Sequence, residues 1–113
     1  MTLDAAIARY FVTADGSDPE AFGSAFAADA IVQDEGRTYR GRDEIIAWRN
    51  AANAKYRITV TPSAVAERGG KTIVTALVAG DFPKAGLPDP LYLEYRFGLA
   101  GAEIASLSIG LPR

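Results

Sequence analysis

Acid–base chemistry in this sequence must fall to Asp, Glu, Tyr or Lys side chains, because histidine and cysteine are both absent. Asp34 is the strongest candidate. It lies in the segment 26–41, FAADAIVQDEGRTYRG, where apolar residues flank an acidic pair. We expect this segment to form the floor and lip of a pocket, whose apolar surroundings would tune the pKa of the Asp34 carboxyl. Glu35, by strand alternation, would face away. The alternative is that residues 34–36 form only a hairpin turn, with Gly36 at a left-handed position.

The same absences restrict the possible cofactors. Without histidine and cysteine the chain cannot build a Ser-His-Asp triad, a His-ligated zinc site or a thiolate metal site. We therefore expect chemistry that uses neither a metal nor an organic cofactor.

The charge balance argues against a nucleic-acid partner. The chain has 12 basic and 14 acidic residues, a net charge of -2, whereas nucleic-acid binders normally show a basic excess or stripe. Six basic residues do fall close together, but acidic residues stand among them, which is typical of a mixed, solvated surface. They are Arg37, Arg40, Arg42, Arg49, Lys55 and Arg57.

The amino-terminal segment MTLDAAIARYFVTAD carries Asp4 and Arg9 within its apolar run. This pattern predicts an amphipathic helix and not a signal peptide. No apolar stretch approaches the ~18 residues that a membrane-spanning helix requires. We therefore expect a cytoplasmic protein that makes no contact with a membrane.

Apolar residues recur at helical spacing in three segments before residue 57. The first helix buries one face, made of Leu3, Ile7, Tyr10, Phe11 and Ala14. The second begins with Asp18 as N-cap and Pro19 in the first turn, and we expect it to end near residues 28–29. The third follows Gly41, with an inner stripe of Ile45, Trp48 and Ala52.

From residue 57 the apolar period becomes two, which predicts strands over 57–63, 72–82, 91–99 and 105–111, with a Pro- and Gly-rich loop at 83–90. The inward row of the third of these strands is Leu91, Leu93, Tyr95, Phe97 and Leu99. This order indicates an α+β domain spanning residues 1–113, with three N-terminal helices packed on a curved, mainly antiparallel sheet. Such a sheet leaves a concave apolar interior, where small ligands bind.

Four stretches carry a family likeness: IARYF, DPEAFGSAFAADAIVQDEG, YRGRDEIIAW and the YRF near the end of the sheet. Together they cover nearly the whole chain, which resembles the NTF2-like superfamily and, within it, the SnoaL-like and ketosteroid-isomerase-like proteins. The resemblance implies a cone-shaped, cystatin-like α+β fold. It also implies a homodimer that pairs through the outer face of the sheet.

Ketosteroid isomerase uses an aspartate base together with an oxyanion hole of one tyrosine and one protonated aspartic acid. Carried over by resemblance, the tyrosine falls on Tyr10 and the base on Asp34, at the family's spacing. The third position falls on Leu93, which cannot donate a hydrogen bond. Losing one oxyanion donor typically costs ~3 kcal/mol of transition-state stabilisation. Tyr10 also has a plainer interpretation as a core residue, since a buried tyrosine usually finds a backbone partner.

The resemblance implies a small-molecule-binding protein, acting as an isomerase or cyclase on an apolar carbonyl compound. Asp34 and Tyr10 would be its catalytic residues. The substrate would be held by Phe26, Trp48, Leu91, Leu93, Tyr95 and Phe97. Each of these six could instead be core. The alternative function is a non-catalytic ligand-binding or self-association module of the same fold.

Overall fold

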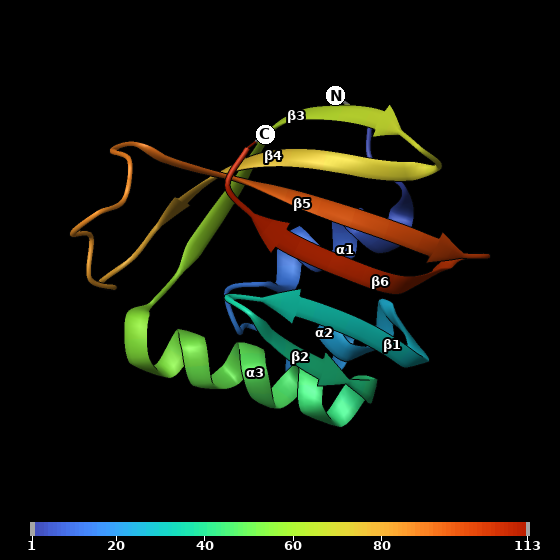
Figure 1. Cartoon of the computed structure of the whole chain (residues 1–113). Helices are drawn as coiled ribbons and strands as arrows, with labels where there is room; N and C mark the ends of the chain where they lie inside the picture. The colour runs from blue at the N-terminus through green and yellow to red at the C-terminus, as the bar shows by residue number, and fades with distance from the viewer. Residues whose placement is uncertain (1, 113) are drawn as a thin grey trace.

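The structure is a computed structural model that describes residues 2–112. Six strands in this part of the chain form one curved sheet in the order β2-β1-β6-β5-β4-β3. The strands are β1 (Phe26–Asp34), β2 (Arg37–Arg40), β3 (Thr59–Arg68), β4 (Lys71–Ala79), β5 (Leu91–Ala100) and β6 (Glu103–Gly110). Neighbours are antiparallel except β1 and β6, which run parallel. The expected α+β class and mainly antiparallel sheet are therefore confirmed (Figure 1).

Within the described residues three helices accompany the sheet: α1 (Ala5–Thr13), α2 (Pro19–Ser24) and α3 (Gly41–Tyr56). Only α1 and α2 precede the strands, because α3 follows the hairpin of β1 and β2, so the expectation of three N-terminal helices holds only roughly. In Figure 1, α1 and α2 lie behind the sheet, while α3 runs beside β1 and β2.

Capping side chains fix where the first two helices begin. Asp4 accepts a hydrogen bond from the backbone N–H of Ala6 at 3.0 Å, and Asp18 accepts one from Ala21 at 3.1 Å. Both satisfy donors that the first turn of a helix leaves unpaired. The predicted start of α2 at Asp18 and Pro19 is confirmed.

The predicted end of α2 near residues 28–29 is wrong. The helix ends at Ser24, because the residues that follow form hydrogen bonds with β6. The N–H of Ile104 donates to the carbonyl of Ala25 at 2.9 Å, and Phe26 pairs with Ile104 in the sheet. A partner almost eighty residues away therefore overrides the local helical pattern.

The hairpin turn that the sequence suggested for residues 34–36 is present between β1 and β2, with Asp34 paired to Arg37 across it. Glu35 and Gly36 both have positive φ, 53° and 75°. Two central residues with positive φ match the twist of antiparallel strands in a two-residue turn. The turn therefore sets Asp34 at the very end of β1.

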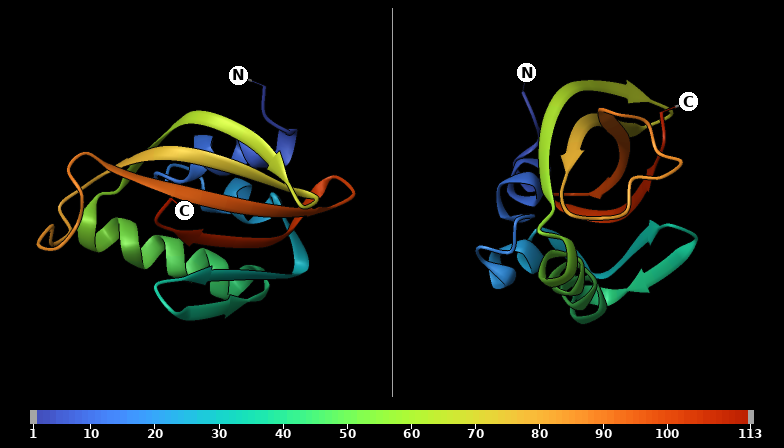
Figure 2. Two further views of the ribbon diagram at one scale, coloured as in Figure 1. Left: turned by 45° about the horizontal axis from the view of Figure 1, so that its top comes forward. Right: turned by 90° about the vertical axis from the view of Figure 1, so that its left-hand side faces the viewer.

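The strand predicted over 72–82 ends earlier, at Ala79. The chain leaves the sheet there because the N–H of Asp81 donates to the carbonyl of Tyr56 at 2.7 Å, at the end of α3. Gly80 permits this approach, since a Cβ at that position would lie 2.9 Å from the same carbonyl oxygen. The segment between β4 and β5 then crosses in front of the curved strands, as the right-hand view of Figure 2 shows.

The inward row of β5 is confirmed in part. Tyr95 and Phe97 are buried and Leu91 and Leu93 are half-buried, but Leu99 is 37% exposed. The register shifts between Gly98 and Leu99, which breaks the alternation of faces at the end of the strand.

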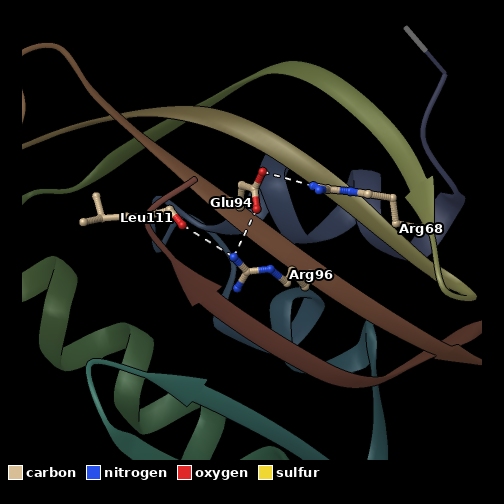
Figure 3. Close-up of polar contacts among 4 residues, drawn as sticks. All are labelled: Arg68, Glu94, Arg96 and Leu111. Atoms are coloured by element: carbon tan, nitrogen blue, oxygen red, sulfur yellow. Dashed lines mark hydrogen bonds and ion pairs between the residues drawn. The ribbon is translucent and has the colours of Figure 1, made fainter. Parts of the chain in front are cut away.

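Glu94 lies on the outer side of β5, where it is buried between two arginines (Figure 3). Its Oε2 lies 3.1 Å from Arg68 Nη2, and its Oε1 lies 3.0 Å from Arg96 Nη2. Burial would raise the pKa of Glu94, but hydrogen bonds and the charges of the two arginines hold it below its usual value. Glu94 therefore serves as an ionic link between strands.

Candidate functional site

A cavity of about 950 Å³ opens between α3, the turn of the β1–β2 hairpin, β5 and the segment that joins β4 to β5. Its wall is mostly apolar, with side chains such as Trp48, Val78, Phe82, Leu91 and Leu93. Charged side chains, among them Arg37, Glu44 and Lys55, also line it and are exposed to solvent. The shape and lining are typical of a small-molecule site.

Five of the eight residues expected at the site line this cavity: Asp34, Trp48, Leu91, Leu93 and Tyr95. Three lie elsewhere. Tyr10, Phe26 and Phe97 are each 0% exposed and belong to the aromatic core, where the Tyr10 ring centroid lies 6.1 Å from Phe26 and 5.5 Å from Phe97. They form the layer behind the cavity wall, because Tyr95 contacts both Tyr10 and the cavity.

Asp34 is half-buried at the end of β1. Burial, helped by the neighbouring charge of Glu35, raises the pKa of its carboxyl to about 6, although a hydrogen bond with Trp48 and the charge of Arg49 oppose the shift. A carboxyl with a pKa near 6 can accept a proton and return it close to neutral pH. Asp34 therefore has the protonation behaviour of a general base.

Tyr10 is completely buried, and its hydroxyl has no hydrogen-bond partner among the described residues. Burial, helped by the charge of Asp34 and opposed by that of Arg49, raises its pKa to about 12. The Tyr10 phenol therefore stays protonated and lies within electrostatic reach of both charged groups.

Tyr95 completes the group, with its ring centroid 6.0 Å from that of Tyr10. Burial raises its pKa well above the ordinary value, with smaller effects from Tyr10, Arg49 and Asp34. The charges of Asp34 on β1 and Arg49 on α3 thus act on both phenols, Tyr95 in the cavity wall on β5 and Tyr10 behind it on α1.

Arg49 is the member of this group that the sequence interpretation missed, since it placed Arg49 on a solvated surface. The side chain lines the cavity, yet the residue is only 5% exposed. Its Nε donates to the carbonyl of Ala14 at 2.8 Å, and its guanidinium carbon lies 5.5 Å from the Trp48 ring centroid. Arg49 follows the buried Ile45 by four residues, a spacing that places both on one helix face and could have revealed it.

A metal centre finds no support in residues 2–112, where no group of three or more carboxylate side chains could hold an ion. The three described helices are all too short or too polar to span a membrane. The site is thus a mostly apolar cavity whose lining includes the Asp34 carboxyl, the Arg49 guanidinium and the Tyr95 phenol, with the Tyr10 phenol in the layer behind Tyr95.

Comparison with known proteins places this fold in a family. The model of the SnoaL-like domain matches residues 7–100. The chain belongs to the SnoaL-like family. Its resemblance to NTF2-like and ketosteroid-isomerase-like proteins is confirmed by solved structures. No functionally curated protein shows significant sequence similarity to it.

Among solved structures, a Sinorhizobium meliloti protein proposed to be a polyketide cyclase is 32% identical, with a TM-score of 0.86 over 96% of this chain and 95% of that one. A Catenulispora acidiphila protein with a ketosteroid-isomerase-like fold, solved with trimethylamine, is 25% identical, with a TM-score of 0.80 over 96% and 86%. An NTF2-like protein from Cytophaga hutchinsonii, 10% identical with a TM-score of 0.76 over 99% and 91%, shares the fold.

Proposed function

We propose that this SnoaL-like protein is a cofactor-free isomerase or cyclase that moves a proton on an apolar carbonyl compound, with Asp34 as its base. One observation carries the proposal. Asp34 lies in a large, mostly apolar cavity, and burial there raises its pKa to about 6. The SnoaL-like match and the similarity to a protein proposed to be a polyketide cyclase support the same class of substrate.

In the proposed reaction, the Asp34 carboxylate removes a proton from the carbon beside the carbonyl group. The C–H electron pair becomes the C=C bond of an enolate, and the carbonyl oxygen takes the negative charge. For an isomerisation, Asp34 then returns the proton to a different carbon. For a cyclisation, the enolate carbon attacks a second carbonyl carbon, and the proton goes to the oxygen of that carbonyl.

The apolar body of the substrate would lie against Trp48, Leu91, Leu93 and Tyr95, which line the cavity. Phe26 and Phe97 would act from behind this wall as packing residues. Tyr10 is the proposed oxyanion donor, and the hydroxyl without a protein partner supports that role. Because Tyr10 is 0% exposed, the role requires a bound substrate to reach the layer behind Tyr95.

The experiment compares the wild-type protein with Asp34→Asn on a panel of steroid enones and short aromatic polyketones. We expect turnover by the wild type and a loss of about a hundredfold or more in the variant. Equal turnover by the two proteins would remove Asp34 from the mechanism. Asp29→Asn, an exposed carboxylate on the same strand, is the matched control and should leave turnover unchanged.

A non-catalytic binding module is the second candidate. It is favoured by Leu93, which stands where a donor is expected, and by the packing of Tyr10 in the core. Native mass spectrometry of the purified protein distinguishes the two functions when it is combined with the assay. A co-purified apolar ligand that the protein never converts would favour the binding module.

The family resemblance also leads us to propose a homodimer through the outer face of the sheet. Tyr92, on the outer side of β5, is 38% exposed and would be covered by a partner. Light scattering at micromolar concentration should give twice the mass of the chain, and Tyr92→Lys should weaken the association. A monomer at that concentration would contradict the proposal.

A further inference from the structure

Arg49 is a buried cation whose charge the surrounding protein does not neutralise by direct contact. None of the three ion pairs among residues 2–112 involves it. Its Nε is bonded to the carbonyl of Ala14, but its Nη2 is buried without a hydrogen-bond partner among the described residues. An arginine cannot lose its charge in a protein, and a buried charge without a partner is unfavourable. A negatively charged oxygen next to Nη2 would accept its hydrogen bond and neutralise the charge of Arg49.

Because Arg49 lines the cavity, a ligand bound there could supply that oxygen. The residue lines the cavity beside Trp48, and its charge lowers the pKa values of Asp34, Tyr10 and Tyr95. The Tyr10 hydroxyl, for which residues 2–112 offer no hydrogen-bond partner either, is a second buried donor within the reach of the same charge. A planar guanidinium is well suited to carboxylate or enolate oxygens.

We infer that Arg49 binds an anionic oxygen of the ligand at the inner end of the cavity, and that Asp34 takes up a proton when this anion binds. The inference rests on the proposed function, since it uses the same cavity, and it names the ligand class. The ligand is a fused apolar carbonyl compound with an acidic enol, which binds as its enolate once Asp34 holds the proton, and an aromatic carboxylate can stand in for that enolate. In the reaction, Arg49 would stabilise the enolate oxygen and so replace the donor that is missing at Leu93.

The charges at the site explain why Asp34 should take up a proton when the anion binds. With Asp34 ionised, its negative charge offsets that of Arg49 and repels an anion. With Asp34 protonated, the inner end carries a net positive charge and can also donate a hydrogen bond. The titratable or polar groups around Asp34 are Glu35 on the turn, Trp48 and Arg49 on α3, Tyr10 on α1 and Tyr95 on β5. Arg37, Glu44 and Lys55 line the same cavity and are exposed.

The test uses two probes of the same size, 2-naphthoate and the neutral 2-naphthalenemethanol, in calorimetric titrations at about pH 5.5 and about pH 8. The carboxyl of naphthoate, with a pKa of about 4, is ionised at both values. The chain has one tryptophan, Trp48, so a shift of its indole N–H signal in NMR spectra shows that a probe occupies the cavity.

For the wild type we expect naphthoate to bind more tightly than the alcohol at the lower pH. Its affinity should fall by about tenfold per pH unit above pH 6, as the Asp34 proton is lost. Titration in two buffers of different ionisation enthalpy should show the uptake of close to one proton at the higher pH. The affinity of the alcohol should change little.

Two variants separate the roles. Asp34→Asn should bind naphthoate tightly at both pH values without taking up a proton. Arg49→Met should lose the preference for naphthoate, and Arg49→Lys should recover part of it. If Arg49→Met fails to fold, the wild-type pH series and Asp34→Asn still decide the matter.

Equal affinity for both probes at both pH values, with the Trp48 signal shifted, would overturn this inference and leave the proposed function standing. A preference for naphthoate that survives in Arg49→Met would also overturn it. A Trp48 signal that neither probe shifts at millimolar concentration would contradict both proposals, since both place an apolar ligand in this cavity.

Discussion

Arg49 and Asn53, one turn apart on α3, both donate hydrogen bonds to the carbonyl oxygen of Ala14, at 2.8 Å and 2.9 Å. Ala14 is the C-cap residue that follows the last residue of α1, so its carbonyl would otherwise lack a partner. The two bonds tie α1, which carries Tyr10, to α3, which carries Trp48 and Arg49. The inner end of the cavity depends on this link between helices.

Removing one of these bonds should weaken the fold. We expect Asn53→Ala to lower the free energy of unfolding by about 1 kcal/mol, the usual net value of one hydrogen bond. Urea denaturation measures the change. Asn50→Ala, an exposed position on the same helix, is the control and should be neutral or slightly stabilising. Equal midpoints for the two variants would show that the Asn53 bond contributes nothing.

Asp34 should destabilise the protein at neutral pH. Its folded pKa, about 6, lies above the unfolded value, so its ionisation is harder in the folded state. The penalty is absent below about pH 4, grows between pH 4 and 6, and is complete above pH 6.

The matching variant makes this penalty measurable. Asp34→Asn should raise the free energy of unfolding at pH 7 by about 1–2 kcal/mol, less than the full linkage value because Asp34 is only half-buried. The gain should disappear at about pH 4. Thermal unfolding at the two pH values measures it, with Asp29→Asn as the exposed control. A variant that is less stable than the wild type at pH 7 would contradict the assignment.

Tyr10→Phe separates a structural hydroxyl from a catalytic one. The hydroxyl has no hydrogen-bond partner in the described part of the chain, so its removal should leave stability unchanged or slightly higher. If it is the oxyanion donor, kcat should fall by about a hundredfold with little change in the unfolding midpoint. An unchanged kcat in a stable variant would show that Tyr10 is only a core residue, and Arg49 would remain as the proposed donor.

The buried Glu94 should contribute more to stability than Glu103, a glutamate in an exposed ion pair. Its side chain is 8% exposed between Arg68 and Arg96, whereas Glu103, paired with Arg42, is 47% exposed. We expect Glu94→Gln to cost about 1–3 kcal/mol and Glu103→Gln less than about 1 kcal/mol. Because the folded pKa of Glu94 is lowered, its contribution is present above the unfolded pKa and is lost as the pH falls through the folded one. Equal losses in urea denaturation would contradict the difference.

Local signals were sufficient for much of the fold. Asp18 with Pro19 correctly marked the start of α2, and Asp34 to Gly36 correctly marked the hairpin turn, because caps and turns depend on a few adjacent residues. The predicted ends of α2 and β4 were wrong, because residues far away in the sequence bind the backbone there. Ile104 ends α2 early by pairing with Phe26, and the carbonyl of Tyr56 ends β4 early by binding Asp81.

The site shows the same division. Strand alternation fixes a face, so Leu91, Leu93 and Tyr95 could be expected on one side of β5, but it could not show that Phe97 on the same side belongs to the core. Tyr10 was correctly expected to be buried, but periodicity cannot separate a core position from a cavity wall. Arg49 was misjudged because its burial depends on the docking of α3 against the end of α1, which no run of neighbouring residues encodes.

The measurement that most directly tests Asp34 as a base is the exchange of α-deuterium from labelled 2-tetralone into water, followed by NMR. The probe is a fused apolar ketone, so the experiment requires no knowledge of the native substrate. We expect the wild type to catalyse the exchange, with a rate that rises through about pH 6 as Asp34 ionises. We also expect a rate lower by about a hundredfold to ten-thousandfold in Asp34→Asn. Equal exchange rates for the wild type and Asp34→Asn, or no catalysis above buffer by a wild-type protein that binds the ketone, would contradict this role of Asp34.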